Sequence, residues 1–232
     1  QHTATKLSDG RVLVAGGRNG NTVYASAWIY DPTFETFTTA GNAPVAVFNQ
    51  MAVGLPDGRV IFLGGESNFA TNAAYLWTPT AGFSNAVNGG DLRAGGTAAY
   101  TNGVAIFMGG YSSASTNFLS LPLLGTAFFP SSSQLSLTNG GLSTGRVYPA
   151  SAVMGNGKVL ISGGLGLSPS SLDTAEVFDA NTGTFSAATN IMATARAFHA
   201  AVTLPNGRVL VGGGGAAFGS STMHSSCEIY NP

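Results

Sequence analysis

The sequence predicts an all-β protein built from five copies of one four-stranded unit. Three observations support this prediction: a turn dipeptide, an apolar strand and a glycine pair recur together five times; the turn glycines are evenly spaced; and aromatic residues follow the glycine pairs at similar distances. Self-similarity at a period of about 50 residues is typical of repeat architectures, in which each unit packs against its neighbours.

The repeated segment can be followed by eye in the sequence. It reads DGRVLVAGG from Asp9, DGRVIFLGG from Asp57, NGVAIFMGG from Asn102, NGKVLISGG from Asn156 and NGRVLVGGG from Asn206. The turn glycines Gly10, Gly58, Gly103, Gly157 and Gly207 are therefore 48, 45, 54 and 50 residues apart. We predict one domain over residues 1–232, with repeats at about 1–46, 47–90, 91–144, 145–194 and 195–232.

The first two strands of each copy follow from local chemistry. Asp-Gly or Asn-Gly between two apolar runs predicts a hairpin with a type I′ turn, which needs positive φ at both central residues. A strand of small residues, such as His2 to Leu7, precedes the turn and suits the crowded centre of a ring. The apolar strand after it, such as Val60 to Leu63, is expected to be buried on both faces. The glycine pair ends this strand where the backbone bends.

Aromatic residues mark the third and fourth strands. The third strands are expected at Trp28 to Tyr30, Tyr75 to Trp77, Val177 to Phe178 and Ile229 to Tyr230, and Phe37, Phe83 and Phe185 open the fourth strands. This pattern resembles the kelch repeat along essentially the whole chain, and is similar to the secreted bacterial repeats related to the galactose oxidase propeller. The resemblance implies a kelch-type β-propeller with five four-stranded blades.

Two copies depart from the pattern. The third strand of copy three is expected over Phe118 to Pro122, without the usual aromatic signature, and the long spacing predicts an insertion near Phe128 to Leu142. The last copy reaches Pro232 where its fourth strand should begin. Either a five-blade ring has one short blade, or the chain is part of a larger propeller, since kelch rings more commonly have six or seven blades. We expect the edge at Cys227 to Asn231 to be completed by a further strand, from a partner or from the same polypeptide.

Composition excludes several classes of partner. Charged residues make up only 8% of the chain and the net charge is −1, so no nucleic-acid partner and no membrane insertion are expected. Low charge with abundant Ser, Thr and Asn favours an extracellular or cell-surface location, and no signal peptide is expected ahead of the strand that begins near Gln1. Cys227 is the only cysteine, which excludes an internal disulfide. It occupies the repeat position of Ala27 and Ala175 and is predicted to be a small, buried core residue.

Candidate ligand-binding residues lie on the face of the long loops that follow the glycine pairs, because function tends to reside on variable loops. Arg93, Arg146 and Arg196 precede three innermost strands and could bind an acidic sugar. The interpretation that we favour is structural, with each arginine bonding backbone carbonyls between neighbouring blades. His2 and His199 share one repeat position and are further candidates. No metal site is expected, since His224 has no acidic or Cys partner nearby in the sequence.

Two functions from different classes remain open. The first is a non-enzymatic interaction module that binds a protein or glycan through the long-loop face and that could self-assemble. The alternative is a carbohydrate-acting enzyme, similar to sialic-acid mutarotases or to a degenerate galactose oxidase. The galactose oxidase resemblance implies a copper site with two Tyr, two His and a Cys–Tyr crosslink. No such Tyr–His cluster stands out in the sequence, so no cofactor and no catalytic residue are predicted.

Overall fold

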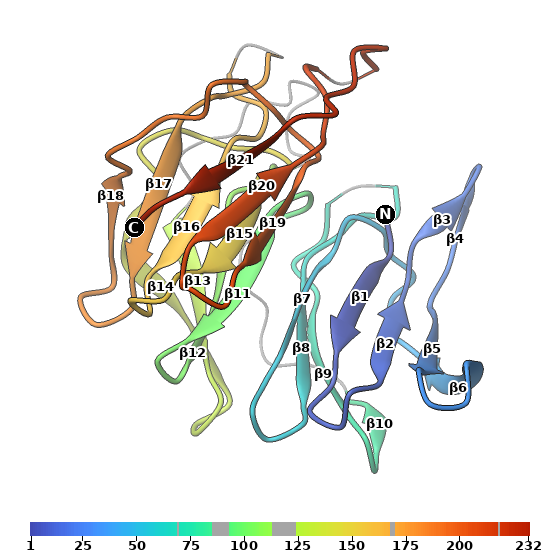
Figure 1. Ribbon diagram of the computed structural model, residues 1–232. Helices are drawn as coiled ribbons and strands as arrows, with labels where there is room; N and C mark the ends of the chain where they lie inside the picture. Colours follow the sequence, from blue (N-terminus) through green and yellow to red (C-terminus); the bar gives the residue numbers. More distant parts are fainter. Residues whose placement is uncertain (69, 85–92, 113–123, 168–169, 218) are drawn as a thin grey trace.

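The structure is a computed structural model that describes residues 1–68, 70–84, 93–112, 124–167, 170–217 and 219–232. Within these ranges the chain is all β, and its five main sheets are arranged as the blades of a propeller (Figure 1). Four blades have four strands and the last has three, as the sequence predicts. In the described part of the chain, no helix is long and apolar enough to cross a membrane.

Each blade runs in order from the innermost to the outermost strand. The strands are β1 (Thr3–Lys6), β2 (Val12–Ala15), β5 (Ser26–Asp31) and β6 (Thr36–Asn42) in blade 1; β7 (Met51–Gly54), β8 (Val60–Leu63), β9 (Ala74–Thr78) and β10 (Gly82–Phe83) in blade 2; β11 (Thr97–Thr101), β12 (Val104–Met108), β13 (Leu124–Phe129) and β14 (Gln134–Gly141) in blade 3; β15 (Ala150–Val153), β16 (Val159–Ser162), β17 (Ala175–Asp179) and β18 (Thr184–Ala187) in blade 4; and β19 (Ala200–Thr203), β20 (Val209–Gly212) and β21 (Cys227–Tyr230) in blade 5. A small hairpin, β3 (Arg18–Asn19) and β4 (Thr22–Val23), lies in the first long loop.

The hydrophobic core is divided among the boundaries between consecutive blades. The second strands β8, β12 and β16 are buried along their whole length, as predicted, because a blade packs on each of their faces. Leu13 and Ile29 of blade 1, for example, pack against Val60 and Phe62 of blade 2. The innermost strands also lie side by side in the order β1, β7, β11, β15 and β19. Each blade is therefore stabilised mainly by the blades beside it.

The hairpin turns lie at one end of the blades and the glycine-pair loops at the other (Figure 1). The predicted type I′ geometry is right only for the third copy, where both Asn102 and Gly103 have positive φ. The other four copies have one more residue in the turn, so that only the glycine has positive φ, as at Gly10. Leu7 and Arg11 close this loop by a backbone hydrogen bond of 2.8 Å. A three-residue loop with glycine in the left-handed position is the alternative hairpin solution.

The expectations for the third strand of copy three are wrong in part. The predicted segment Phe118 to Pro122 lies outside the described residues, but the strand that pairs with β12 is β13, which begins at Leu124. Its Phe128 is fully buried and supplies the core aromatic. The region predicted as an insertion, Phe128 to Leu142, instead holds the end of β13 and all of β14. The long spacing misled the prediction because it moved the aromatic away from its usual position.

Cys227 is exposed, which corrects the prediction of a buried core residue. The residues at the same repeat position, Ala27 and Ala175, are buried. The difference arises from the neighbours: blade 2 packs against blade 1 and blade 5 against blade 4, but among the described residues no blade covers this face of β21.

Candidate functional site

A chain of backbone hydrogen bonds runs around the inner rim on the side of the glycine-pair loops. Just before each innermost strand, an N–H donates to the carbonyl of the equivalent residue one blade earlier: Asn49 to Gln1 (2.9 Å), Gly95 to Asn49 (2.9 Å), Tyr148 to Gly95 (2.7 Å) and Phe198 to Tyr148 (3.1 Å). Asn49, Tyr148 and Phe198 have φ of 54°, 54° and 58°. Asn adopts the left-handed region readily, but at aromatic residues such as Tyr148 and Phe198 this backbone stores strain of about 1–3 kcal/mol each, and such strain clusters at functional sites.

This rim borders a pocket of about 680 Å³ to which all five blades contribute. The blades supply, in order, Gln1, His2 and Arg18; Phe48, Asn49 and Glu66; Gly96 and Tyr111; Tyr148 and Pro149; and Phe198 and His199. Its volume lies in the range of pockets that bind small molecules. The pocket opens on the face of the long loops, because Arg18, Glu66 and Tyr111 each directly follow a glycine pair.

A polar cluster crosses the pocket between blades 2, 3 and 4. The carboxylate of Glu66 accepts hydrogen bonds from the Asn49 amide, at 2.8 Å, and from the Tyr111 hydroxyl. The Asn49 amide also donates to the Tyr148 hydroxyl oxygen, at 3.1 Å. Burial raises the pKa of both Tyr111 and Tyr148, and the bond to Glu66 raises that of Tyr111 further. Both phenols are therefore neutral, hydrogen-bonding groups at physiological pH.

Aromatic rings form another side of the pocket. The rings of Tyr148 and Phe198 stack with their centroids 4.5 Å apart, and Phe198 is 45% exposed. In the lining from blades 1 and 2, the guanidinium of Arg18 lies over the ring of Phe48, 4.3 Å from its centroid, and its Nε donates to Oε1 of Gln1. The pocket thus combines flat apolar surface, fixed hydrogen-bonding groups and one exposed cation at its rim.

Comparison with known proteins agrees with this architecture. The sequence profile of the Kelch motif matches residues 7–44, which extend from the end of β1 past the end of β6. The chain has the β-propeller fold, and its first blade matches the Kelch motif. A solved structure, that of YjhT, superposes with a TM-score of 0.77 at 13% sequence identity, over 100% of this chain and 84% of that one. No curated protein matches the sequence.

The three arginines predicted as ligand-binding candidates, Arg93, Arg146 and Arg196, are buried and do not line the pocket. Their guanidinium groups bond carbonyls of their own blade: Arg93 bonds Gly109 O, Arg146 bonds Gly163 O and Thr174 O, and Arg196 bonds Gly213 O and Ser226 O. The link between blades is made by the arginine backbone, whose carbonyl accepts from the glycine pair of the preceding blade. These contacts support the structural role, although the side-chain bonds run within a blade and not between blades.

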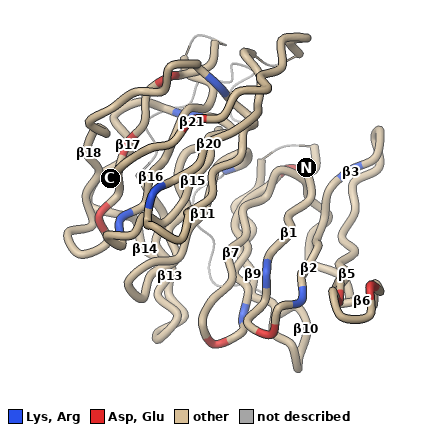
Figure 2. Tube along the Cα trace, in the orientation of Figure 1, with Lys and Arg blue, Asp and Glu red and all other residues tan. Residues whose placement is uncertain are grey.

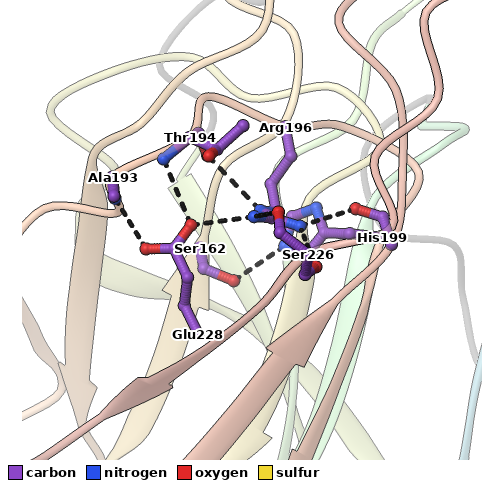
Figure 3. A network of polar contacts seen from close by, with 8 residues as sticks. Ser162, Ala193, Thr194, Arg196, His199, Ser226 and Glu228 are labelled. Carbon is purple, nitrogen blue, oxygen red and sulfur yellow. Dashed lines mark hydrogen bonds and ion pairs between the residues drawn. The ribbon is translucent and has the colours of Figure 1, made fainter.

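Two of these arginines also bind a glutamate. Arg196 lies 2.8 Å from Glu228, whose carboxylate accepts the N–H groups of Ala193 and Thr194 (Figure 3). Arg146 and Glu176 repeat the arrangement in blade 4, at 3.2 Å. Desolvation lowers the pKa of Arg146 and the nearby Glu176 opposes this shift. Each pair links the segment that leads into the innermost strand of a blade with the third strand of the same blade.

Both candidate histidines line the pocket, so ligand binding by His2 and His199 stays a prediction that this geometry permits. Nε2 of His199 lies 2.9 Å from the Ser162 hydroxyl of blade 4 (Figure 3). Burial, and then the charge of Arg196, lowers the pKa of His199 to about 4, so the ring is neutral at physiological pH. Among the described residues, no three His, Cys, Asp or Glu side chains are grouped so as to hold a metal.

Sequence reasoning missed Asn49, Glu66, Tyr111 and Tyr148. For Glu66 and Tyr111 a signal exists in the repeat itself: the residue after the glycine pair is Arg18, Glu66, Tyr111, Leu165 or Gly215, while the glycines before it do not change. A position that varies beside an invariant one, at the mouth of a ring, indicates a functional surface on a constant scaffold.

Proposed function

We propose that this protein is a binding module that takes a glycan in the axial pocket, at an extracellular or cell-surface location. The kelch-propeller fold is consistent with an interaction module. The observation that carries the proposal is the position of the stacked Tyr148 and Phe198 rings beside the Glu66–Asn49 pair. Sugars present C–H faces that pack on aromatic rings and hydroxyls that bond carboxylates and amides, so one ligand can use both surfaces.

The ligand favoured by this pocket is an acidic sugar. Arg18 supplies an exposed guanidinium at the rim, and guanidinium groups bind carboxylates by paired hydrogen bonds. Two other arginines pair with acidic residues at the hairpin turns, Arg11 with Asp9 and Arg59 with Asp57 (Figure 2). The low charge of the chain is also consistent with the proposed location outside the cell.

The test is calorimetric titration with sialic acid as the acidic probe and galactose as the neutral one. Phe198→Ala is expected to weaken binding of both sugars by at least about tenfold, which corresponds to roughly 1.4 kcal/mol. Arg18→Gln is expected to weaken binding of sialic acid alone. Phe34→Ala is the matched control, because this exposed aromatic lies in the β5–β6 turn and is not among the pocket residues. Equal affinity in all four proteins, or no binding of either sugar, would refute the proposal.

A second candidate function is supported by one contact. Glu66 and Tyr111 place a carboxylate and a phenol in direct hydrogen bond inside the pocket, a pairing suited to proton transfer to and from a sugar. A mutarotase-like enzyme would then speed the exchange between the anomers of the bound sugar. Exchange rates measured by NMR would fall in Glu66→Gln while binding persists. Identical rates with and without the wild-type protein exclude this function and leave the binding module intact.

A further inference from the structure

The ring has four boundaries between consecutive blades and an opening where a further one would lie. β19 and β15 pack as neighbours, as do β1 and β7, but β19 and β1 do not pack on one another in this way. In Figure 1 blade 5 and blade 1 stand apart on the near side of the molecule. Three features of the two blades that flank this opening indicate what occupies it.

The first feature is the glycine pair of blade 5. At the four earlier pairs, a Cβ on the first glycine would overlap the carbonyl oxygen that leads into the next blade: Val47 for Gly16, Arg93 for Gly64, Arg146 for Gly109 and Arg196 for Gly163. The second glycine of each pair donates its N–H to the same carbonyl. At Gly213, by contrast, no described atom lies within 4 Å of such a Cβ. Blade 5 thus has the receiving site for a following blade, and that site is open.

The second feature is the face of blade 5 that points away from blade 4. Val202, Leu210 and Ile229 lie in one cross-strand row, in the register that Ala152, Leu160 and Val177 have in blade 4. Val177 is 9% exposed because blade 5 covers it, whereas Ile229 is 51% exposed. Cys227 belongs to the same open face. Exposed apolar patches of this kind mark interaction surfaces.

The third feature is the opposite wall, on blade 1. Ala4, Val14 and Trp28 form a cross-strand row on the face that points away from blade 2. Trp28 is 46% exposed, whereas Tyr75, at its repeat position in blade 2, is 1% exposed under blade 1. Both walls therefore carry side chains that are buried between blades elsewhere in the molecule. They require an occupant with two apolar faces, one for each wall.

We propose that the opening between blades 5 and 1 is the docking site of one further kelch blade, carried by the same polypeptide outside residues 1–232. Such a blade has two apolar faces, and the carbonyl leading into its first strand fits against Gly213 and accepts from Gly214. The comparison with YjhT indicates its size. Five repeats match 84% of that chain, so the unmatched remainder corresponds to about one more repeat.

Two residues report directly on the opening. The chain has two tryptophans, of which Trp77 is buried between blades and Trp28 lies on the blade 1 wall. Its only cysteine, Cys227, lies on the blade 5 wall. The emission wavelength of Trp28 and the rate at which a thiol reagent labels Cys227 therefore measure solvent access to the two walls separately. Trp28→Phe identifies the emission that belongs to Trp28.

The test compares chain 1–232 with an extended chain. In the extended chain, Pro232 is followed by a copy of residues 181–194, which supplies the missing outer strand of blade 5, and then by a copy of residues 145–194, which supplies a complete blade. The extended chain is expected to be monomeric, with Trp28 emission at shorter wavelength and Cys227 labelled at least about tenfold more slowly. Extension by residues 181–194 alone should leave both reporters accessible. Gly213→Ala should prevent closure of the extended chain, while Gly10→Ala, another glycine with positive φ but nothing near its Cβ, should permit it.

Reporters that are equally accessible in the extended and unextended chains would overturn the proposal. So would protection of both reporters in chain 1–232 as its concentration rises, since a second copy would then fill the opening. A measurement on the native protein decides the matter even if the fusion does not fold. An antibody against residues 1–232 should detect a polypeptide longer than 232 residues by at least one repeat in the producing cells, and a 232-residue product refutes the idea.

Discussion

Blades 4 and 5 hold the same arginine–glutamate pair at the same repeat positions, but in different surroundings. The side chain of Glu176 in blade 4 is 3% exposed, and that of Glu228 in blade 5 is 23% exposed. Both carboxylates accept two backbone N–H groups and both arginines are buried. What differs is the outer strand: Glu176 pairs with Ala187 of β18, and blade 5 has no such strand in the described residues.

The comparison shows that burial in this fold is decided by neighbouring strands and blades more than by the sequence of a blade itself. The same repeat gives a buried ion pair in blade 4, where β18 is present, and a partly solvent-exposed ion pair in blade 5, which has no such strand in the described residues. The energetic weight of an equivalent residue should therefore fall from blade 4 to blade 5. Two experiments test this gradient, and another tests a contact that blade 5 has and blade 4 lacks.

The largest effect is expected from Arg146→Ala. This change leaves the Glu176 carboxylate buried without its cation and removes the donor of two carbonyls, so the free energy of unfolding should fall by about 3–5 kcal/mol. Arg196→Ala should lower it by about 1–3 kcal/mol, because water can reach Glu228. Urea unfolding of both variants provides the measurement. Equal losses, or melting temperatures that are unchanged in both, would contradict the comparison.

The second experiment concerns a titratable group that blade 5 has and blade 4 lacks. His199 bonds Ser162 across the boundary between these blades, while blade 4 has Pro149 at that repeat position. Its folded pKa of about 4 lies below the ordinary 6.5, so the unfolded chain takes up the proton first as the pH falls. Protonation of His199 therefore leaves the free energy of unfolding unchanged above about pH 6.5 and lowers it as the pH falls from 6.5 to 4.

The loss of stability over this interval should be about 3 kcal/mol, because a tenfold difference in proton affinity between the folded and unfolded chains corresponds to about 1.4 kcal/mol. His199→Gln is the control, because Gln50 occupies this position in blade 2 and does not titrate. The pKa of Glu228 is lowered because its backbone and Arg196 hydrogen bonds outweigh desolvation, so its protonation reduces stability only below about pH 4.5. Urea midpoints of the wild-type protein and of His199→Gln, measured between pH 7 and 4.5, separate the contribution of His199 from that of Glu228. Parallel curves would mean that His199 does not couple pH to stability.

Local rules predicted the fold from the sequence, and they fail where several blades meet. The glycine pairs, turn dipeptides and third-strand aromatics such as Trp28 and Phe178 fix the repeat, because each lies within one hairpin or one strand. The polar cluster of the pocket was not predicted, since Glu66, Tyr111 and Tyr148 belong to three blades and approach only when the blades assemble. Cys227 was wrongly placed for the same reason: its repeat position indicates burial, but burial requires a neighbour.

The smallest effect is expected from a pair of apolar truncations in the third strands. Val177→Ala removes two methyl groups from the core between blades 4 and 5, and should lower the free energy of unfolding by about 2 kcal/mol. Ile229→Ala removes more atoms at the same repeat position, yet should change it by less than about 0.5 kcal/mol, because the side chain is already half in water. Thermal unfolding of chain 1–232 measures both. If the larger truncation, Ile229→Ala, causes the smaller loss in the free energy of unfolding, then the face of blade 5 is uncovered and that of blade 4 is covered. If Ile229→Ala instead matches or exceeds Val177→Ala, something covers the blade 5 wall in the isolated chain, and self-association should then be sought by sedimentation.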